Sequence, residues 1–324
     1  SFFIMIAYVN NMYFFCKLKL ITKIQISMKR ATLLLFTYLF YNFTIYSETK
    51  EQTDSYQLEA SYVGDLVGNM SGGIKQGGTF LGMANITLGV YTEGIGWWKN
   101  GEFFINGASI HGASPTENLV GDFQVISNID AGEHTYIHEL WYKHSFKKVN
   151  IIAGLQDLNE NYAASETADE YINSSFGIPP VIAENVPVPI FPLTGLGLSV
   201  EWEVTSKINW LNAVFDGCPS DFSENKYNLK WDLNKDDGFL IISELQFNAM
   251  EDALSTYRLG YYYHTGLSEL DEDTETMSEV FSRNYGIYLI IDQNLWSKGK
   301  KTIDLFAQIA VSPYKDVNQH NHYV

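Results

Sequence analysis

Two stretches of this 324-residue sequence bring ion-binding side chains close together, and neither has the pattern of a metal site. The acidic run at 232–238 resembles a calcium loop, but Gly238 comes one position late and Ser243 stands where a glutamate ligand is needed. His320 and His322 lie near the chain end, where histidines are usually solvated. Gly-x-Ser-x-Gly, Cys-x-x-Cys and phosphate-loop motifs are absent from the sequence. We therefore expect no catalytic group, no metal and no cofactor.

A larger set of polar side chains occupies alternate positions in apolar segments. Carboxylates, amides and a guanidinium so placed could bind the hydroxyl groups of a solute and set the electric field of a water-filled channel. The members are Glu139, Glu201, Glu203, Glu244, Gln246, Arg258, Asp304 and Gln308. The alternative is that some of them only hydrate a wide lumen or pair with one another.

The elements that would position these side chains are strands, because apolar and polar residues alternate with period two. In 196–205, for example, Leu198 and Val200 share one face while Glu201 and Glu203 share the other. We count about eleven such segments of about ten residues each, which suits tilted strands crossing a bilayer, whereas globular strands have about five or six residues. The segments are 56–62, 81–91, 101–111, 135–146, 149–157, 196–205, 207–216, 239–249, 255–265, 284–293 and 302–312.

The lengths of the connections alternate along the chain. Those after odd-numbered strands are long, at 63–80, 112–134, 158–195, 217–238 and 266–283. Those after even-numbered strands are shorter, at 92–100, 147–148, 206, 250–254 and 294–301. Outer-membrane barrels have short periplasmic turns and long external loops. This alternation favours an all-β fold, an antiparallel transmembrane up-and-down β-barrel, over a secreted β-sandwich, which has no reason to alternate in this way.

Two further features agree with a barrel in a membrane. Trp97, Trp98 and Trp296 fall in the shorter connections, where an interfacial aromatic belt would place them, although scattered surface aromatic residues are the alternative. An odd strand count does not close a bacterial barrel, and an open strand edge in lipid is costly. We therefore predict that the barrel is truncated at its C-terminus, a miscounted strand being the alternative.

Composition and the N-terminal region indicate export. The net charge of −17 argues against nucleic acid as a partner, because phosphates would be repelled. Met28-Lys29-Arg30 precede an apolar run at 31–40, which is the layout of a secretory signal cleaved after Ser47; the alternative, a membrane anchor at 2–16, is short for a span. The mature chain would keep only Cys218, so no intramolecular disulfide is expected. The predicted division is an upstream extension at 1–27, a signal peptide at 28–47, an N-terminal tail at 48–55 and a barrel domain at 56–324.

The long connection at 158–195 is a candidate for a functional loop. Its proline-rich stretch at 187–192 would be stiff, because proline fixes a backbone angle. We hypothesise that the loop folds inward and narrows a pore. The residues expected near the constriction are Asn173, Ser174, Ser175 and Phe176. The alternative is an external loop packed on its neighbours.

Several loop motifs resemble those of the carbohydrate-selective, OprB-like porins of Gram-negative bacteria. The matching stretches are 62–65, 72–73, 121–129, 139–141, 154–159, 173–180, 187–192 and 195–197. The resemblance runs from about residue 56 to the C-terminus, and the order and spacing of the 173–180 and 187–192 stretches are its most specific part. It implies a barrel of about sixteen strands, of which this chain would lack the last several.

The resemblance also implies passive diffusion of small sugars across the Gram-negative outer membrane. Sugars as solutes and outer-membrane lipid are then the expected partners, with a homo-oligomer as a further option, and the particular sugar is not specified. Two other classes stay open from the sequence. One is a soluble secreted carbohydrate-binding β-sandwich. The other is an outer-membrane barrel enzyme, which would need serine, histidine and an orienting partner gathered at one rim.

Overall fold

The computed structural model describes residues 6–9, 43–231, 233, 237–249, 255–266, 284–313 and 318–324. Most of the predicted upstream extension and signal peptide, and part of the acidic run at 232–238, lie outside these described residues. The signal peptide, its cleavage site and the domain division therefore stay predictions.

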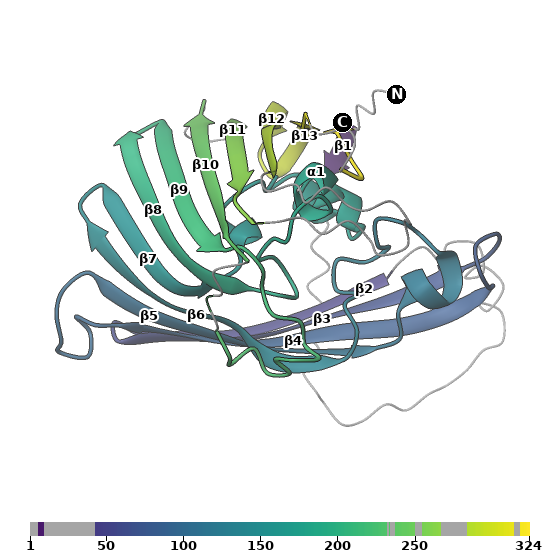
Figure 1. Ribbon diagram of the computed structural model, residues 1–324, viewed down its shortest axis with the longest axis horizontal. Helices are drawn as coiled ribbons and strands as arrows, with labels where there is room; N and C mark the ends of the chain where they lie inside the picture. Colours follow the sequence, from purple (N-terminus) through teal and green to yellow (C-terminus); the bar gives the residue numbers. More distant parts are fainter. Residues whose placement is uncertain are drawn as a thin grey trace.

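The described chain forms one antiparallel sheet in which β2 to β13 follow one another in chain order (Figure 1). Every strand expected from the alternation is present, so the predicted up-and-down fold is confirmed. Three strands, β1, β2 and β14, were not predicted. The bounds are β1 Ile6–Val9, β2 Phe43–Gln52, β3 Tyr56–Asn69, β4 Gly77–Tyr91, β5 Gly101–Gly112, β6 His134–Phe146, β7 Val149–Gln156, β8 Gly195–Thr205, β9 Ile208–Asp216, β10 Phe239–Asn248, β11 Ser255–His264, β12 Asn284–Lys298, β13 Lys301–Val311 and β14 His322–Tyr323.

The sheet curls around a central space without closing within the described residues (Figure 1). β13 pairs with β12 on one side, and its other side pairs with β1 near one end and β14 near the other. At the opposite edge β2 pairs with β3 from Phe43 to Gln52, across the predicted cleavage position after Ser47. One continuous curled sheet rules out the two stacked sheets of a β-sandwich.

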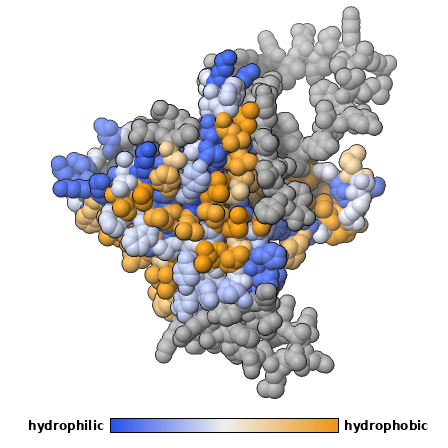
Figure 2. All heavy atoms as spheres, turned by 90° about the horizontal axis from the view of Figure 1, so that it is seen from above, coloured by the Kyte–Doolittle hydropathy of each residue, from blue (hydrophilic) through white to orange (hydrophobic). Residues whose placement is uncertain are grey.

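The outer face of the sheet is apolar and exposed, as the alternation predicted. On β10, Ile241, Leu245 and Phe247 are each about two-fifths exposed, whereas Leu240 and Glu244 on the opposite face are fully buried. Figure 2 shows apolar side chains gathered in a broad patch on the face that it displays. A belt of exposed apolar residues around one sheet is what a lipid bilayer requires of a β-barrel. No helix in the described part of the chain is long and apolar enough to cross a membrane.

The inner face carries an apolar region that the alternation of residues did not predict. The connection between β7 and β8 enters the curl of the sheet with three short 3₁₀ helices and the helix α1, Pro180–Ala183 (Figure 1). It covers apolar side chains that point inward from β9 to β13, and the two surfaces make the largest hydrophobic core. The members from the connection are Leu158, Tyr162, Ala163, Ile178, Val181, Ile182, Val186 and Val188; those from the strands are Leu211, Ala213, Phe215, Leu240, Ile242, Tyr262, Tyr288, Ile290 and Ala310.

The tryptophans of the expected aromatic belt occupy two kinds of position. Trp97 and Trp98 lie in the β4–β5 turn, stacked at a ring-centroid distance of 5.3 Å, and the Trp98 indole donates a 2.6 Å hydrogen bond to Tyr142. Trp296 lies inside β12 and not in a connection, so its predicted place was wrong. The cause is that β12 continues to Lys298, past a bulge that interrupts the alternation.

Replacing Leu245 by arginine tests the lipid-facing assignment. We expect Leu245→Arg to lower the free energy of unfolding in lipid vesicles by about 2 kcal/mol or more, because a charge would face hydrocarbon. Asn209→Arg is the matched control, since Asn209 lies opposite Gln246 on the inner face of β9 and is expected to change stability much less. Urea unfolding followed by tryptophan fluorescence measures both, and equal losses would contradict the assignment.

Candidate functional site

A polar cavity of about 1110 Å³ lies inside the curled sheet. Its walls are the inner faces of β3 to β11 and two long connections, 113–133 between β5 and β6 and 157–194 between β7 and β8. The apolar core described above fills the space on the side of β9 to β13, so most of the strand residues along the cavity come from β3 to β9. The cavity is therefore displaced to one side of the lumen.

Negative charge dominates the cavity wall. Three permanent cations line it, Lys147, Lys148 and Arg258. Eight carboxylates line it, namely Asp130, Asp157, Glu160, Glu166, Asp169, Glu184, Glu201 and Glu203. A narrow space with this excess of one sign concentrates counter-ions of the opposite sign.

Two of the carboxylates on the 157–194 connection hold their protons more tightly than usual. The Glu160 side chain reaches the cavity, yet enclosure by the surrounding protein raises its pKa, and the neighbouring Asp157 raises it further. Enclosure likewise raises the pKa of Asp169, with the nearby carboxylates of Asp292 and Glu166 adding to the effect. As the pH is lowered, both carboxylates are therefore protonated, and become neutral, at a higher pH than an ordinary carboxylate.

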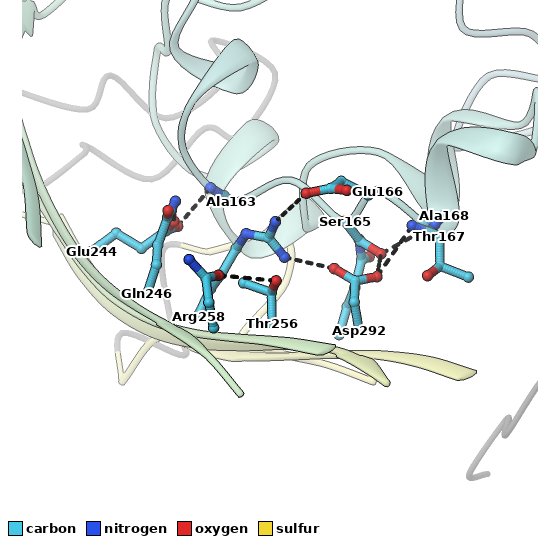
Figure 3. Close-up of polar contacts among 12 residues, drawn as sticks. Ala163, Ser165, Glu166, Thr167, Ala168, Glu244, Gln246, Thr256, Arg258 and Asp292 are labelled. Atoms are coloured by element: carbon cyan, nitrogen blue, oxygen red, sulfur yellow. Dashed lines mark hydrogen bonds and ion pairs between the residues drawn. The ribbon is translucent and has the colours of Figure 1, made fainter. Parts of the chain in front are cut away.

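The buried carboxylate of Glu244 fastens the 157–194 connection to the inner wall (Figure 3). One of its oxygens, Oε2, accepts hydrogen bonds from the Ala163 backbone N–H at 2.8 Å and from the Tyr288 hydroxyl at 2.7 Å. The other oxygen accepts a 2.7 Å bond from the Gln246 amide. Charge-assisted bonds of this kind compensate the carboxylate for its removal from water.

A second anchor joins β11 and β12 to the same connection (Figure 3). Arg258 contacts Asp292 at 2.6 Å, and both side chains are buried. Asp292 also accepts a 2.6 Å bond from the Ser165 hydroxyl and a 3.2 Å bond from the Thr167 N–H. On the cavity side, Arg258 reaches Glu166 at 3.3 Å, and the Glu166 side chain is 65% exposed.

A β-bulge places His138 on the cavity wall. The pairing of β5 with β6 shifts between Asn106 and Gly107, so that His138 is an extra residue beside Glu139. The His138 Nε2 atom lies 3.2 Å from the Asp157 carboxylate, and both side chains are almost fully buried. Asp157 also accepts bonds from the N–H groups of Asn159 and Phe191, and it thus holds both ends of the connection near β6.

The two long connections meet across the lumen. Asn128 N–H donates to the Ile172 carbonyl at 2.7 Å, and Ser174 N–H donates to the Val125 carbonyl at 3.1 Å. The 113–133 connection is in turn fixed to β3 by a buried 2.6 Å bond from Ser127 to Asp65. The alternative of an external loop is therefore wrong, because the 157–194 connection lies inside the sheet.

The expected constriction residues lie between the 113–133 connection, which bonds to Asn173 and Ser174, and the strands β13 and β14. Phe176 packs its ring against Phe306, and the Gln308 amide donates to the Gly177 carbonyl at 2.9 Å. The Tyr323 hydroxyl donates a 2.6 Å bond to the Ser175 carbonyl. The Asn173 side chain caps the short helix that follows it. Of the four expected residues, Ser174 lines the cavity and the other three support it.

The expected pore-lining residues divide into two groups of four. Glu201, Glu203, Gln246 and Arg258 line the cavity. Glu139, Glu244, Asp304 and Gln308 lie on the inner wall but are buried and bonded to other protein groups. The reason is that alternation identifies the inward face of a strand and does not identify which part of that face a loop covers.

Sequence reasoning missed most of the polar groups of the site, including the cavity-lining carboxylates of the two long connections. Asp292 could have been found, since it continues the inward series of Tyr288 and Ile290 on β12. His138 carried no signal, because the bulge that turns it inward breaks the period of two. Asp157 closes the predicted strand 149–157, and the alternation of apolar and polar residues does not distinguish it from a turn residue.

The chain is similar to a known protein family and to a solved structure. A family model described as "Carbohydrate-selective porin, OprB family" matches residues 76–324. A solved structure described as "High pH structure of Pseudomonas putida OprB" is similar with a TM-score of 0.74, covering 83% of this chain and 69% of that chain. Its sequence identity is 19%, at which the likeness shows the fold alone. No curated protein matches the chain.

The anchor formed by Arg258 and Asp292 is open to a direct test. We expect Asp292→Asn to lower the free energy of unfolding by about 3 kcal/mol, because it leaves a buried guanidinium without its buried counter-charge. Glu166→Gln removes the exposed partner of the same arginine and should cost under about 1 kcal/mol. Urea unfolding measures both, and protease cleavage within 157–194 should increase only in Asp292→Asn. Similar losses in the two variants would contradict the anchor.

Proposed function

The chain belongs to the carbohydrate-selective porin, OprB family, and from this premise we propose that it provides a water-filled path for passive diffusion of sugars across the outer membrane of a Gram-negative cell. The family resemblance predicted from the loop motifs is thereby confirmed. One observation carries the proposal for this chain: a polar cavity of about 1110 Å³ inside a sheet whose outer face is apolar.

Passage of a sugar through such a cavity needs no bond to be made or broken. Each hydroxyl exchanges water for an amide, carboxylate or hydroxyl of the wall, and each contact is weak enough to be released. Glu201, Glu203, Gln246 and Arg258 offer such groups directly on the cavity side. Glu139, Glu244, Asp304 and Gln308 contribute indirectly, by holding the wall and the loop in place.

The two connections that meet across the lumen would set the width of the path. Ser174 presents a small side chain to the cavity while its backbone is bonded to the opposite connection. Support from β13, through Gln308 and Phe306, would keep this segment rigid. Residues 173–176 are therefore proposed as part of the constriction.

Location in the outer membrane completes the proposal. The apolar outer face would contact lipid, and export would use the predicted signal peptide at 28–47. A homo-oligomeric assembly is part of the same proposal.

Swelling of proteoliposomes in isotonic sugar solutions tests the proposed function. We expect the purified protein to admit monosaccharides faster than trisaccharides, because the cavity is narrowed by the two connections. Ser174→Trp should slow the larger sugars severalfold and the monosaccharides less. Swelling rates equal to those of protein-free liposomes would refute the function, and an unchanged size dependence in Ser174→Trp would refute the constriction.

Ion selectivity tests the charge of the wall. The excess of carboxylates should make small-ion currents cation-selective at neutral pH, and this preference should fall as the pH is lowered toward 5. Cation selectivity is expected to fall, and not to rise, because the pKa values of Glu160 and Asp169 are raised and protonation removes their negative charge. Reversal potentials in a potassium chloride gradient provide the measurement. The double variant Glu160→Gln with Asp169→Asn should flatten the pH dependence, and anion preference at neutral pH would contradict the assignment.

A further inference from the structure

The 217–238 connection between β9 and β10 crosses to a part of β6 that no neighbouring strand covers. β7 pairs with β6 over Leu140–Phe146, so the preceding residues of β6, 134–139, have no strand on that side among the described residues. There the Ile137 backbone N–H donates a 3.1 Å hydrogen bond to the Tyr227 carbonyl. The connection therefore covers an open strand edge at the end of the sheet where the long loops lie.

Further contacts hold this part of the connection in one conformation. The Phe222 ring stacks on His134 of β6 at a centroid distance of 3.9 Å. The buried Asn228 side chain donates a 2.9 Å hydrogen bond to the Thr194 hydroxyl, and the Trp231 indole donates a 2.9 Å bond to the Asn228 carbonyl. The side chains that it exposes are thus presented from a fixed backbone.

Alternate residues of the connection expose large apolar side chains. Tyr227, Leu229 and Trp231 are 53%, 57% and 37% exposed, whereas Asn228 between them is buried. They extend the exposed apolar face of the strands, on which Val214 of β9 is a member. Tyrosine and tryptophan are enriched where a membrane meets water, so this surface suits the level of the lipid headgroups.

Two exposed lysines lie among these apolar residues. The Lys226 Nζ atom lies 5.5 Å from the centroid of the Tyr227 ring, and the Lys230 Nζ atom donates a 3.4 Å bond to the Glu224 carbonyl oxygen. In the part of the chain that the structure describes, neither ammonium group forms an ion pair with a carboxylate. Both charges are therefore available to an anionic partner.

The described carboxylates of the connection do not neutralise the two lysines. Asp221 accepts a 2.7 Å hydrogen bond from the Ser223 backbone N–H, and Glu224 contacts Lys230 only through its backbone. Asp237 lies at the far end of the connection, directly before β10. The apolar surface thus carries a local positive charge although the whole chain carries a net charge of −17.

We propose that the segment 226–231 binds a phosphate-bearing lipid headgroup of the outer leaflet, an inference that rests on the outer-membrane location in the proposed function. The ammonium groups of Lys226 and Lys230 would donate charge-assisted hydrogen bonds to phosphate oxygens, since lysine side chains reach from an apolar surface to the headgroup level. Leu229 and its apolar neighbours contact the acyl chains of the same lipid. The negative net charge of the chain repels anions, so the lipid is held by this local pair of lysines.

Native mass spectrometry of the purified protein, titrated in detergent with diphosphoryl lipid A, tests the lipid site. The wild type should bind this lipid more tightly than phosphatidylcholine, which has no net charge. The double variant Lys226→Gln with Lys230→Gln should raise the half-saturating lipid A concentration about tenfold, because two charges near the phosphates are lost. Lys99→Gln is the control and should stay within about twofold of wild type, since Lys99 is exposed beside Trp98 but lies 3.4 Å from the Glu93 carboxylate.

Salt and free phosphate separate the two parts of the lipid. Leu229→Gln should weaken lipid A binding severalfold and keep its salt dependence, whereas the lysine double variant should lose that dependence, because salt screens exposed charges. Excess inorganic phosphate should leave most of the lipid bound. Complete displacement by inorganic phosphate would identify free phosphate as the ligand and overturn the lipid assignment.

The remaining outcomes decide between a lipid site, a structural role and the proposed function. Unchanged affinity in the lysine double variant, an equal loss in Lys99→Gln, or equally tight binding of phosphatidylcholine would each overturn the lipid site. Urea unfolding without lipid should be the same for the double variant and the wild type, because both lysines are exposed; a loss of stability would indicate a structural role instead. Lipid binding that persists without sugar flux would overturn the proposed function alone.

Discussion

The packing of the 157–194 connection against the inner wall of β9 to β13 is the constraint on which the other features of the lumen depend. Leu240, Ile242 and Ile290 point inward and are fully buried, although inward residues of a water-filled barrel would be hydrated. The connection removes them from water, and burial of apolar surface is the dominant favourable term in folding. One side of the lumen therefore becomes a protein core, and the polar cavity is confined to the other side.

Apolar packing alone would let the connection slide, because hydrophobic contacts have no fixed direction. Glu244 and Asp292 make directional contacts. Each carboxylate is fully buried, and each accepts a hydrogen bond from a backbone N–H of the connection. A buried charge is tolerated only where it is paired and hydrogen-bonded, so these carboxylates specify one position of the loop. Acidic residues on the inner face thus serve two purposes, as anchors where the loop covers them and as wall charges where it does not.

The cavity wall in turn contains paired and unpaired polar groups, and the difference arises from strand geometry. Regular pairing of β7 with β8 lets Asn150 and Glu201 meet across the sheet. The bulge in β6 instead inserts His138 out of register with β5, and the buried Oδ1 atom of Asn106 has no hydrogen-bond partner among the described residues.

The amino-acid sequence by itself determined strands β3 to β13, their antiparallel order and their apolar outer face, because alternation and connection length are local properties of the chain. It also indicated the family, through loop motifs such as 173–180 and 187–192. Only the tertiary structure decided which inward residues reach the cavity, since Glu244 bonds to Ala163 across 81 residues and Asp292 to Ser165 across 127. A period of two assigns a side chain to a face, and what covers that face depends on contacts between distant segments.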